Sequence, residues 1–237
     1  MRVHIAAIGR HAERVIEPIT RLKADKAYLL TYSEDDNASE YLKEIKKILK
    51  NQNIETNVEF VDIWDTTKCL EKIHEIIEIE KNNQIFINLS TGTKLTAIAS
   101  VMACMFWNAQ PYYAKSKYPS VKFPTKLKFN EIEEIISIPT FKIESPTKES
   151  ITVLKIIKEN KSIQKNLLIE KLKELEIIRP TKGEFLSKPA EHGQLRTILD
   201  VLIKSKFINT ETIGRQSYVK ITNKGETAIT IFEKKSI

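Results

Sequence analysis

The segment "NLSTGTKLTAIAS", from Asn88 to Ser100, concentrates residue types that could bind an anion. It supplies hydroxyls, an ammonium group and one glycine: Ser90, Thr91, Gly92, Thr93 and Lys94. Glycine accepts positive φ and lets the backbone approach a ligand, while hydroxyls and positive charge beside a helix N-terminus suit a phosphate. The same residue types form an ordinary helix start, because Ser and Thr are favoured N-caps. The local sequence leaves both interpretations open.

Two familiar nucleotide-binding motifs do not fit this segment. A P-loop, G-x-x-x-x-G-K-[ST], needs a glycine where the chain has Ile87, and Thr93 separates Gly92 from Lys94. The dinucleotide fingerprint G-x-G-x-x-G also fails, because "IGRHAER" offers only Gly9. The ligand is therefore expected to be a polyanion other than ATP or NAD.

The sequence disfavours several other functional classes. Cys69 and Cys104 provide neither a disulfide framework nor a metal-knuckle spacing, and Asp35 and Asp36 lack a partner set for a metal. The histidines are scattered: His4, His11, His74 and His192. No apolar run of about 18 residues could span a membrane, and the N-terminus shows no convincing signal-peptide cleavage site. We expect no metal, no cofactor, no membrane partner and a cytoplasmic location.

Strand and helix patterns alternate through residues 1–140 and position the polar segment. Buried strands are expected at residues 3–8, 27–32, 58–63, 84–89 and 111–115. Amphipathic helices are expected at residues 38–50 and 69–81, and another from about Lys94. The alternation predicts an α/β fold with a Rossmann-like, mostly parallel sheet and helices on both faces. Such sheets bind ligands at the carboxyl ends of their strands, where the polar segment falls.

The net charge of +7 is confined to the C-terminal part of the 237-residue chain. Residues 1–144 contain 20 Lys and Arg against 20 Asp and Glu, whereas residues 145–237 contain 18 against 11. A stretch with proline and hydroxyl side chains, residues 142–150, marks a boundary near Ser145. We expect two domains, 1–144 and 145–237, the second of which meets a polyanion, although solubility alone would also explain the excess.

Residues 145–237 show the pattern of a winged helix-turn-helix domain. Helices are expected at residues 151–159, 163–175 and 193–206. Alternating strands at residues 207–212 and 217–222 flank the turn "IGRQ" as a β-hairpin wing, and a further helix follows. Such folds place their third helix in the DNA major groove. Winged helices also bind proteins, so the confined positive charge is what favours double-stranded DNA.

The residues expected to contact DNA are exposed positions of the third helix and the wing. They are His192, Gln194, Arg196, Thr197, Arg215 and Lys220. The first four lie off the apolar stripe at the expected N-terminal end of the helix, where side chains reach base edges. Arg215 occupies the wing tip, and Lys220 is placed to meet a phosphate.

The first 140 residues resemble a known family. "VHIAAIGRHAERVIEPITRLKADKAYLL" and "NLSTGTKLTAIASVMACMFWNAQPYY" are similar to the CRISPR-associated Rossmann-fold (CARF) domain, most closely in archaeal transcription regulators that carry a C-terminal winged helix. The resemblance implies a homodimer that binds one cyclic oligoadenylate, most often cyclic tetra-adenylate, on its two-fold axis. It implies a ligand-responsive, DNA-binding transcription regulator of antiviral defence.

The resemblance assigns the ligand contacts to three loops that follow strands. These contacts are Gly9, Arg10, His11, Thr31, Tyr32, Ser33, Asn88, Ser90, Thr91, Gly92, Thr93 and Lys94. Arg10 and His11 would otherwise be a solvated turn, and Asn88 a helix cap. Trp64 reaches the pocket or belongs to the core. Tyr112 and Tyr113 are expected to pack the sheet rather than stack on adenine.

Two further interpretations stay open beside the regulator. In a ring nuclease, Lys94 with Ser90 or Thr93 would help a ribose hydroxyl of the ligand to attack the adjacent phosphate. The sequence offers only His11 as an evident general base there. In a DNA-binding protein with a purely structural Rossmann domain, no nucleotide would have an effect.

Overall fold

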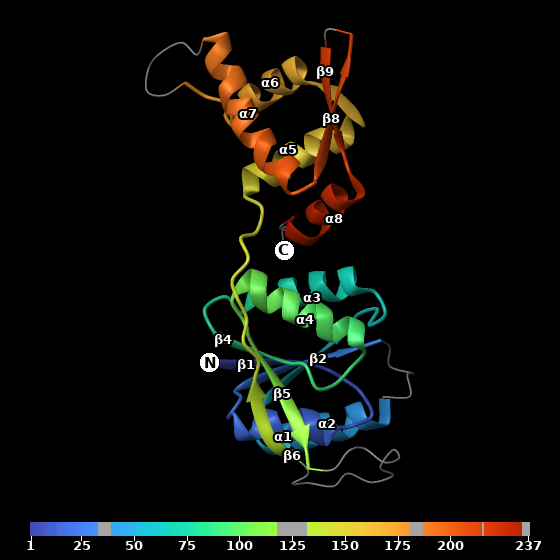
Figure 1. Ribbon diagram of the computed structural model, residues 1–237. Coiled ribbons are helices and arrows are strands. Elements are labelled where there is room, and N and C mark those ends of the chain that lie inside the picture. The colour runs from blue at the N-terminus through green and yellow to red at the C-terminus, as the bar shows by residue number, and fades with distance from the viewer. Residues whose placement is uncertain (33–38, 118–131, 181–186, 215, 234–237) are drawn as a thin grey trace. The chain divides into compact units, whose positions relative to one another are not determined.

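The computed structural model describes residues 1–32, 39–117, 132–180, 187–214 and 216–233 (Figure 1). The chain forms two compact units, residues 1–144 and 145–237, and each is described by itself. Among the described residues, no helix combines the length and the apolar character that a membrane span needs. Arg215 and Ser33, both predicted contact residues, lie outside the described part of the chain.

The N-terminal unit is built on a six-stranded sheet with the order β3-β2-β1-β4-β5-β6. The strands are β1 (Arg2–Ala7), β2 (Lys26–Thr31), β3 (Glu55–Phe60), β4 (Gln84–Asn88), β5 (Gln110–Ser116) and β6 (Ile132–Ser137). The first five are parallel, and β6 pairs antiparallel with β5. The strand order reverses between β1 and β4, so the topological switch point lies at their carboxyl ends. The predicted Rossmann-like α/β fold is confirmed.

Four helices cover the two faces of this sheet (Figure 1). α1 (Glu13–Arg21) and α2 (Ser39–Asn51) lie on one face, and α3 (Thr66–Ile79) and α4 (Lys94–Trp107) lie on the other. The predicted apolar stripes point inward: Ile16 and Ile45 are buried on the first face, and Ile73 is buried within α3. Burial of these stripes is what holds both helical layers on the sheet.

Some boundaries in this unit differ from the sequence prediction. β3 runs from Glu55 to Phe60, three residues earlier than expected, because Thr31 at the end of β2 pairs with Phe60. α3 begins at Thr66 because the Asp65 carboxylate accepts hydrogen bonds from the next backbone amides. β6 was not predicted, since its mixed Ile and Glu sequence belongs to an antiparallel edge strand.

The C-terminal unit has the order of elements of a winged helix. These are α5 (Lys148–Glu159), β7 (Ser162–Gln164), α6 (Lys165–Glu174), α7 (Lys188–Lys204), β8 (Ile208–Ile213), β9 (Gln216–Ile221) and α8 (Asn223–Phe232). The three strands form one sheet with the order β7-β9-β8. Leu154, Leu168, Leu199 and Val219 are buried in a single apolar core. The predicted winged helix fold is confirmed.

The third helix of this unit begins earlier than the sequence suggested. α7 starts at Lys188, five residues before Gly193, because Ser187 is extended and Pro189 occupies the first turn, where its missing N–H costs nothing. His192 therefore lies in the second turn rather than at the helix start. Residues 163 and 164, expected to begin the second helix, belong instead to β7, which pairs with β9.

His4, on β1, is an ionisable side chain with no exposed surface. Its ring stacks on Phe86 with 4.9 Å between centroids, and its Nδ1 shares a 3.2 Å hydrogen bond with the Tyr112 hydroxyl. Nε2 has no hydrogen-bond partner among the described residues. Burial, with a smaller effect of the Arg2 charge, lowers the pKa of His4 from 6.5 to about 4.

We expect His4 to make the stability of the N-terminal unit fall in mild acid. Below about pH 6.5 His4 is protonated in the unfolded chain but not in the folded chain. Stability is therefore lost progressively as the pH falls to about 4. Between pH 7 and pH 5 this cost is about 2 kcal/mol. Urea unfolding followed by tryptophan fluorescence measures it, because Trp64 and Trp107 both lie in this unit.

In His4→Leu the loss of stability between the two pH values should shrink by about the same 2 kcal/mol. Phe86→Leu is the matched control, because it removes the stacked ring and keeps the imidazole. That variant should be weaker than the wild type at both pH values with the pH dependence retained. An unchanged pH dependence in His4→Leu would contradict the assignment.

Candidate functional site

The predicted ligand segment lies at the topological switch point of the sheet. Residues 8–12 follow β1 and residues 89–93 follow β4, and these strands are parallel neighbours. Both connections therefore leave the sheet at the same edge. α4 begins directly after the second connection, so its N-terminal amides also point to this edge.

Two glycines let these connections touch. A Cβ added at Gly9 would lie 3.3 Å from the backbone nitrogen of Gly92. Gly92 has φ +85°, and a Cβ there would lie 2.6 Å from the Ala7 Cβ and 2.5 Å from the Thr96 hydroxyl. Both the dihedral angle and the space exclude a side chain at Gly92. The positive φ that the sequence allowed at this glycine is present, and the close approach in the structure is to Ala7, Gly9 and Thr96.

Asn88 and Ser90 are occupied in holding the segment to its neighbours. The Asn88 amide donates 2.7 Å to the carbonyl of Arg14, and its oxygen accepts from the Ser90 backbone nitrogen at 2.8 Å. The Ser90 hydroxyl accepts a hydrogen bond from the Ala114 amide of β5. Both side chains therefore join the segment to α1 and to the sheet. Asn88 is not the helix cap that the sequence allowed.

Thr93 is the N-cap of α4 and also joins two connections. Its hydroxyl accepts from the Thr96 amide at 3.1 Å and donates 2.8 Å to the carbonyl of Ile63. Ile63 lies between β3 and α3, so this hydrogen bond fixes that connection beside the ligand segment. The capping interpretation therefore holds for Thr93, but not for its neighbours.

The side chains of Thr91 and Lys94 make no such hydrogen bond or ion pair with the described residues. Thr91 is 8% exposed, and its hydroxyl is buried without a hydrogen-bond partner in the described part of the chain. Leaving a buried hydroxyl unsatisfied costs about 1–3 kcal/mol. Lys94 is exposed at the first turn of α4, and no ion pair engages it in the described ranges. Thr91 and Lys94 are therefore the polar side chains of this segment that have no partner in the described ranges.

The other two predicted loops contribute unequally. The His11 Nδ1 lies 3.0 Å from the buried Glu13 carboxylate, and Arg10 is exposed beside it. Thr31 is 2% exposed and sits at the end of β2, whereas the Tyr32 side chain is half exposed. Of the residues predicted in these two loops, Gly9 lies directly against the segment, at Gly92.

Aromatic side chains near the sheet divide into core and surface. Tyr112 is buried, and burial raises the pKa of its hydroxyl well above the usual value of 10, so this residue packs the sheet as predicted. Tyr113 is 38% exposed on β5. Trp64 is 67% exposed, which excludes it from the core.

The predicted DNA contacts on α7 also divide into two groups. The Gln194 amide bonds to the backbone of Arg179 in both directions, at 2.9 and 3.2 Å, so it serves the fold of the unit. His192, Arg196 and Thr197 are exposed. Arg196 forms an exposed ion pair of 3.6 Å with Asp200, and the Thr197 hydroxyl donates a hydrogen bond to the backbone of its own helix.

The predicted wing contact, Lys220 on β9, is partly exposed. Its ammonium pairs with Glu211 on the neighbouring strand at 2.6 Å. An exposed pair of this kind contributes little to stability, so the lysine can exchange its carboxylate for another anion at small cost.

Two family models match the chain in succession. Residues 2–118 match the model described as HFX_2341_N-like, N-terminal, and residues 149–233 match the DUF6293 C-terminal winged helix domain. Each model covers less than half of the 237-residue chain, so the two descriptions say what its domains are similar to. The predicted pairing of a Rossmann-like domain with a winged helix is confirmed by these matches together with the sheet order. No curated protein matches the chain.

Solved structures align with both domains at low identity. Can2 from Sulfobacillus thermosulfidooxidans, in complex with cyclic tetra-adenylate, is 13% identical with a TM-score of 0.45, over 98% of this chain and 64% of that one. VC1899 from Vibrio cholerae is 12% identical, with a TM-score of 0.44 over 93% and 75%. Enterococcus italicus Csm6, bound to cyclic hexa-2'-fluoro-hexa-dAMP, is 12% identical, with a TM-score of 0.43 over 87% and 56%. The chain thus spans less than two thirds of the Can2 and Csm6 chains.

Thr91→Val tests whether the Thr91 hydroxyl stabilises the N-terminal unit or is free for a ligand. Valine has nearly the same shape, so removing an unsatisfied buried hydroxyl should leave the free energy of unfolding unchanged or raise it by up to about 1–2 kcal/mol. Thr93→Val is the matched control and should lower stability by about 1 kcal/mol, because it removes the cap and the bond to Ile63. Urea unfolding measures both. A destabilised Thr91→Val would show that this hydroxyl has a structural partner.

Proposed function

We propose that this protein is a ligand-responsive, DNA-binding transcription regulator. A homodimer of HFX_2341_N-like domains would bind one cyclic oligoadenylate, and the winged helix domains would bind double-stranded DNA. The observation that carries the ligand site is the buried, unpartnered Thr91 hydroxyl, one residue from the glycine contact and three from the exposed Lys94. Within the class, we propose cyclic tetra-adenylate as the ligand.

The chemistry of the switch point supports a phosphodiester ligand. The α4 N-terminus supplies backbone dipoles, Lys94 supplies positive charge, and Thr91 supplies a hydrogen-bond donor. The resemblance of the segment to CARF domains extends this chemistry from phosphate in general to cyclic oligoadenylates. The proposal requires neither a metal nor another cofactor.

The surface of α4 supports a second copy as partner. The helix carries one charged residue, Lys94, in 14 positions, which is typical of a helix buried all round. Yet Ile98, one turn from Lys94 on the same face, is 51% exposed. Val101 and Met105 continue this face and are only partly buried. A second copy covering this stripe would bring the two Lys94 side chains to one two-fold axis.

The hydrogen bonds of the segment weigh against the ring-nuclease alternative. Ser90 and Thr93, the hydroxyls that would assist cleavage, are engaged by the Ala114 amide and by the Ile63 carbonyl. A group held in this way is less available for proton transfer. His11, the candidate general base, is paired with the Glu13 carboxylate at 3.0 Å. Binding without cleavage fits these contacts better.

The DNA interface that we propose combines α7 with the wing. His192, Arg196 and Thr197 are exposed on α7, where side chains of a winged helix can reach base edges. Lys220 would meet the backbone of the DNA. The excess positive charge of residues 145–237 supports a polyanionic partner. Ligand binding would change DNA affinity if the ligand binds the DNA-competent and incompetent dimers unequally.

Calorimetric titration of the full chain with cyclic tetra-adenylate tests the ligand and the oligomer together. We expect one ring bound per two chains, a dimer by light scattering, and intact ring by chromatography afterwards. Thr91→Val and Lys94→Gln should each weaken binding, Lys94→Gln by roughly tenfold or more, since a charge-assisted hydrogen bond contributes about 1.5–3 kcal/mol.

The outcomes of this titration separate the three functions. Linear products would promote the ring nuclease. Absence of heat and of thermal stabilisation with cyclic rings of four and six adenylates would overturn the ligand assignment, because a tight ligand must raise apparent stability. A ring bound to each single chain would overturn the shared two-fold site.

Arg196→Ala and Lys220→Gln should weaken DNA binding in different ways. On a duplex enriched from a random library by the wild type, Arg196→Ala should weaken binding by about 1–3 kcal/mol and relax the sequence preference. Lys220→Gln should weaken all sequences alike and reduce the salt slope by about one. Fluorescence anisotropy over a salt series measures both effects.

Gln194→Ala is the control for a residue of the fold. It removes two hydrogen bonds to Arg179 and should lower the free energy of unfolding of the C-terminal unit by about 1–2 kcal/mol. At low temperature, where the unit stays folded, its sequence preference should be that of the wild type. Equal behaviour of Arg196→Ala and the wild type would contradict base contact by α7.

A further inference from the structure

Trp64 is an exposed aromatic side chain next to the candidate ligand segment. It lies in the connection between β3 and α3 and is 67% exposed. Within the described ranges, no ring, cation or hydrogen bond engages its indole. The preceding residue, Ile63, accepts the 2.8 Å hydrogen bond from the Thr93 hydroxyl. One peptide unit therefore separates this indole from a residue that is bonded to the segment.

The backbone beneath Trp64 is held rigidly. The Trp64 amide donates 3.1 Å to the Asp62 carboxylate, and the Asp65 amide donates 3.0 Å to the Asp62 carbonyl. The Asp65 side chain caps α3, and the Val61 amide bonds the end of β2 at Thr31. The connection is thus fixed on both sides, although its largest side chain contributes nothing to the core. An indole exposed on a fixed backbone is suited to a binding contact rather than to stability.

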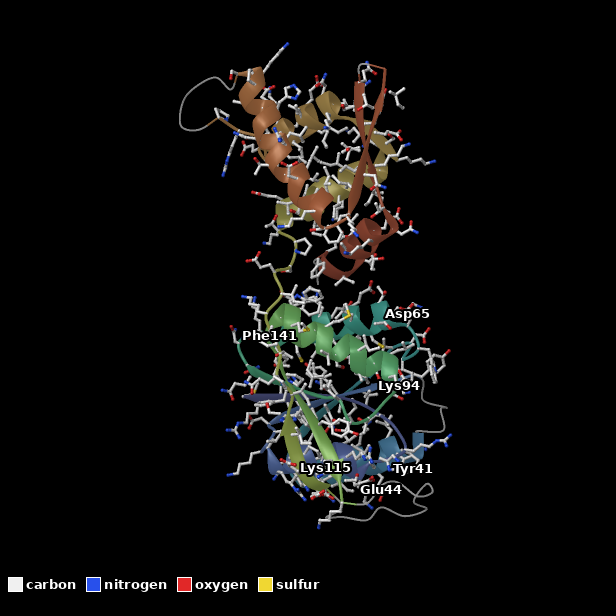
Figure 2. All side chains as sticks on the ribbon, in the orientation of Figure 1. Tyr41, Glu44, Asp65, Lys94, Lys115 and Phe141 are labelled. Carbon is white, nitrogen blue, oxygen red and sulfur yellow. The ribbon has the colours of Figure 1, made fainter. Side chains whose placement is uncertain are left out.

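Trp64 is part of a group of exposed aromatic side chains at one edge of the sheet. Tyr32 follows β2 and is 52% exposed, and Phe60 ends β3 and is 47% exposed. The register pairs Thr31 with Phe60, so Tyr32 and Phe60 leave neighbouring strands at the same level. Figure 2 shows Asp65, the residue after Trp64, and Lys94 at the same end of the layer formed by α3 and α4.

We propose that Trp64 is the stacking platform for a base of the bound nucleotide, with Tyr32 at the border of the same surface. The inference rests on the proposed function, because the bases come from the oligoadenylate. Phosphates held by Lys94 and the α4 N-terminus would leave their attached bases to reach outward toward the neighbouring connection. Stacking on an indole face suits adenine, whose large ring system is apolar on both faces.

Trp64→Ala tests this platform by calorimetric titration with cyclic tetra-adenylate. Binding should weaken about 5- to 100-fold, as for loss of one stacked base. Trp64→Phe should restore most of the affinity, because phenylalanine also stacks. Phe141→Ala is the matched control: this side chain is 78% exposed and lies at the other end of α4 from Lys94 (Figure 2), so its removal should leave the affinity unchanged.

Intrinsic fluorescence gives a second, independent readout. Wild-type emission should be quenched on saturation, and the quench should be absent from Trp64→Phe. The other indole, that of Trp107, is stacked on His74 with 4.0 Å between ring centroids. We therefore expect its emission to change little when the ligand binds. Thermal unfolding without ligand and light scattering should be the same for Trp64→Ala and the wild type.

Each contrary outcome has a distinct meaning. If the wild type binds the ring and the Trp64 variants bind it with the same affinity and the same quench, the platform is overturned and the proposed function stands. Dissociation of the dimer in Trp64→Ala would also overturn it, since the indole would then be covered by a second copy. If wild type binds none of the cyclic adenylates of four or six units, both the proposed function and the platform fail.

Discussion

The contact between two glycines at the switch point is the constraint on which the rest of the site depends. Gly9 and Gly92 bring the connections after β1 and β4 within van der Waals distance. Ala7 and Thr96 lie so close to Gly92 that no side chain fits there. This contact fixes where α4 starts and therefore where Lys94 and the first amides of the helix lie. It also sets the level at which Thr93 reaches the carbonyl of Ile63. A side chain at Gly92 would force its neighbours Ala7 and Thr96 apart, whereas one at Gly9 would ask for a shift of a few tenths of an ångström.

Within this frame, hydroxyl groups that look alike in the sequence do different work. Ser90 and Thr93 have backbone partners supplied by β5 and by the β3–α3 connection. Thr91, between them, has a buried hydroxyl with no partner among the described residues. A buried hydroxyl without a hydrogen-bond partner destabilises the fold, and a bound group that accepts its hydrogen bond would remove this penalty. The capping interpretation holds for Thr93, whereas the anion-binding interpretation of Thr91 and Lys94 stays a prediction.

The parts of the fold that were predictable from sequence are those that local patterns decide. Buried strands and amphipathic helices carry their own periodicity, and residues 84–88 and 39–51 follow from it. The exact extent of β3 depends on pairing with β2, and β6 depends on β5, so neither was readable locally. The role of Gln194 was missed for the same reason, because its partner Arg179 lies 15 residues away. For Trp64 the sequence left the pocket and the core open, because the exposure of a side chain in a connection depends on how that connection folds, and the structure leaves 67% of it exposed.

A sensor of the kind we propose needs one element on which ligand and dimer both act, and α4 has the required properties. Its first residue, Lys94, faces the ligand edge, and one turn later Ile98 starts the exposed apolar stripe. A helix transmits displacement along its axis as a rigid body, so a ligand that pulls on Lys94 changes the surface that a second copy would meet. The coupling is reciprocal: if the ring changes DNA affinity about 100-fold, or about 2.7 kcal/mol, DNA must change the affinity for the ring by the same factor. That energy has to come from contacts that differ between the two dimer states, and exposed side chains on α4 can change partners more cheaply than the buried glycine contact can.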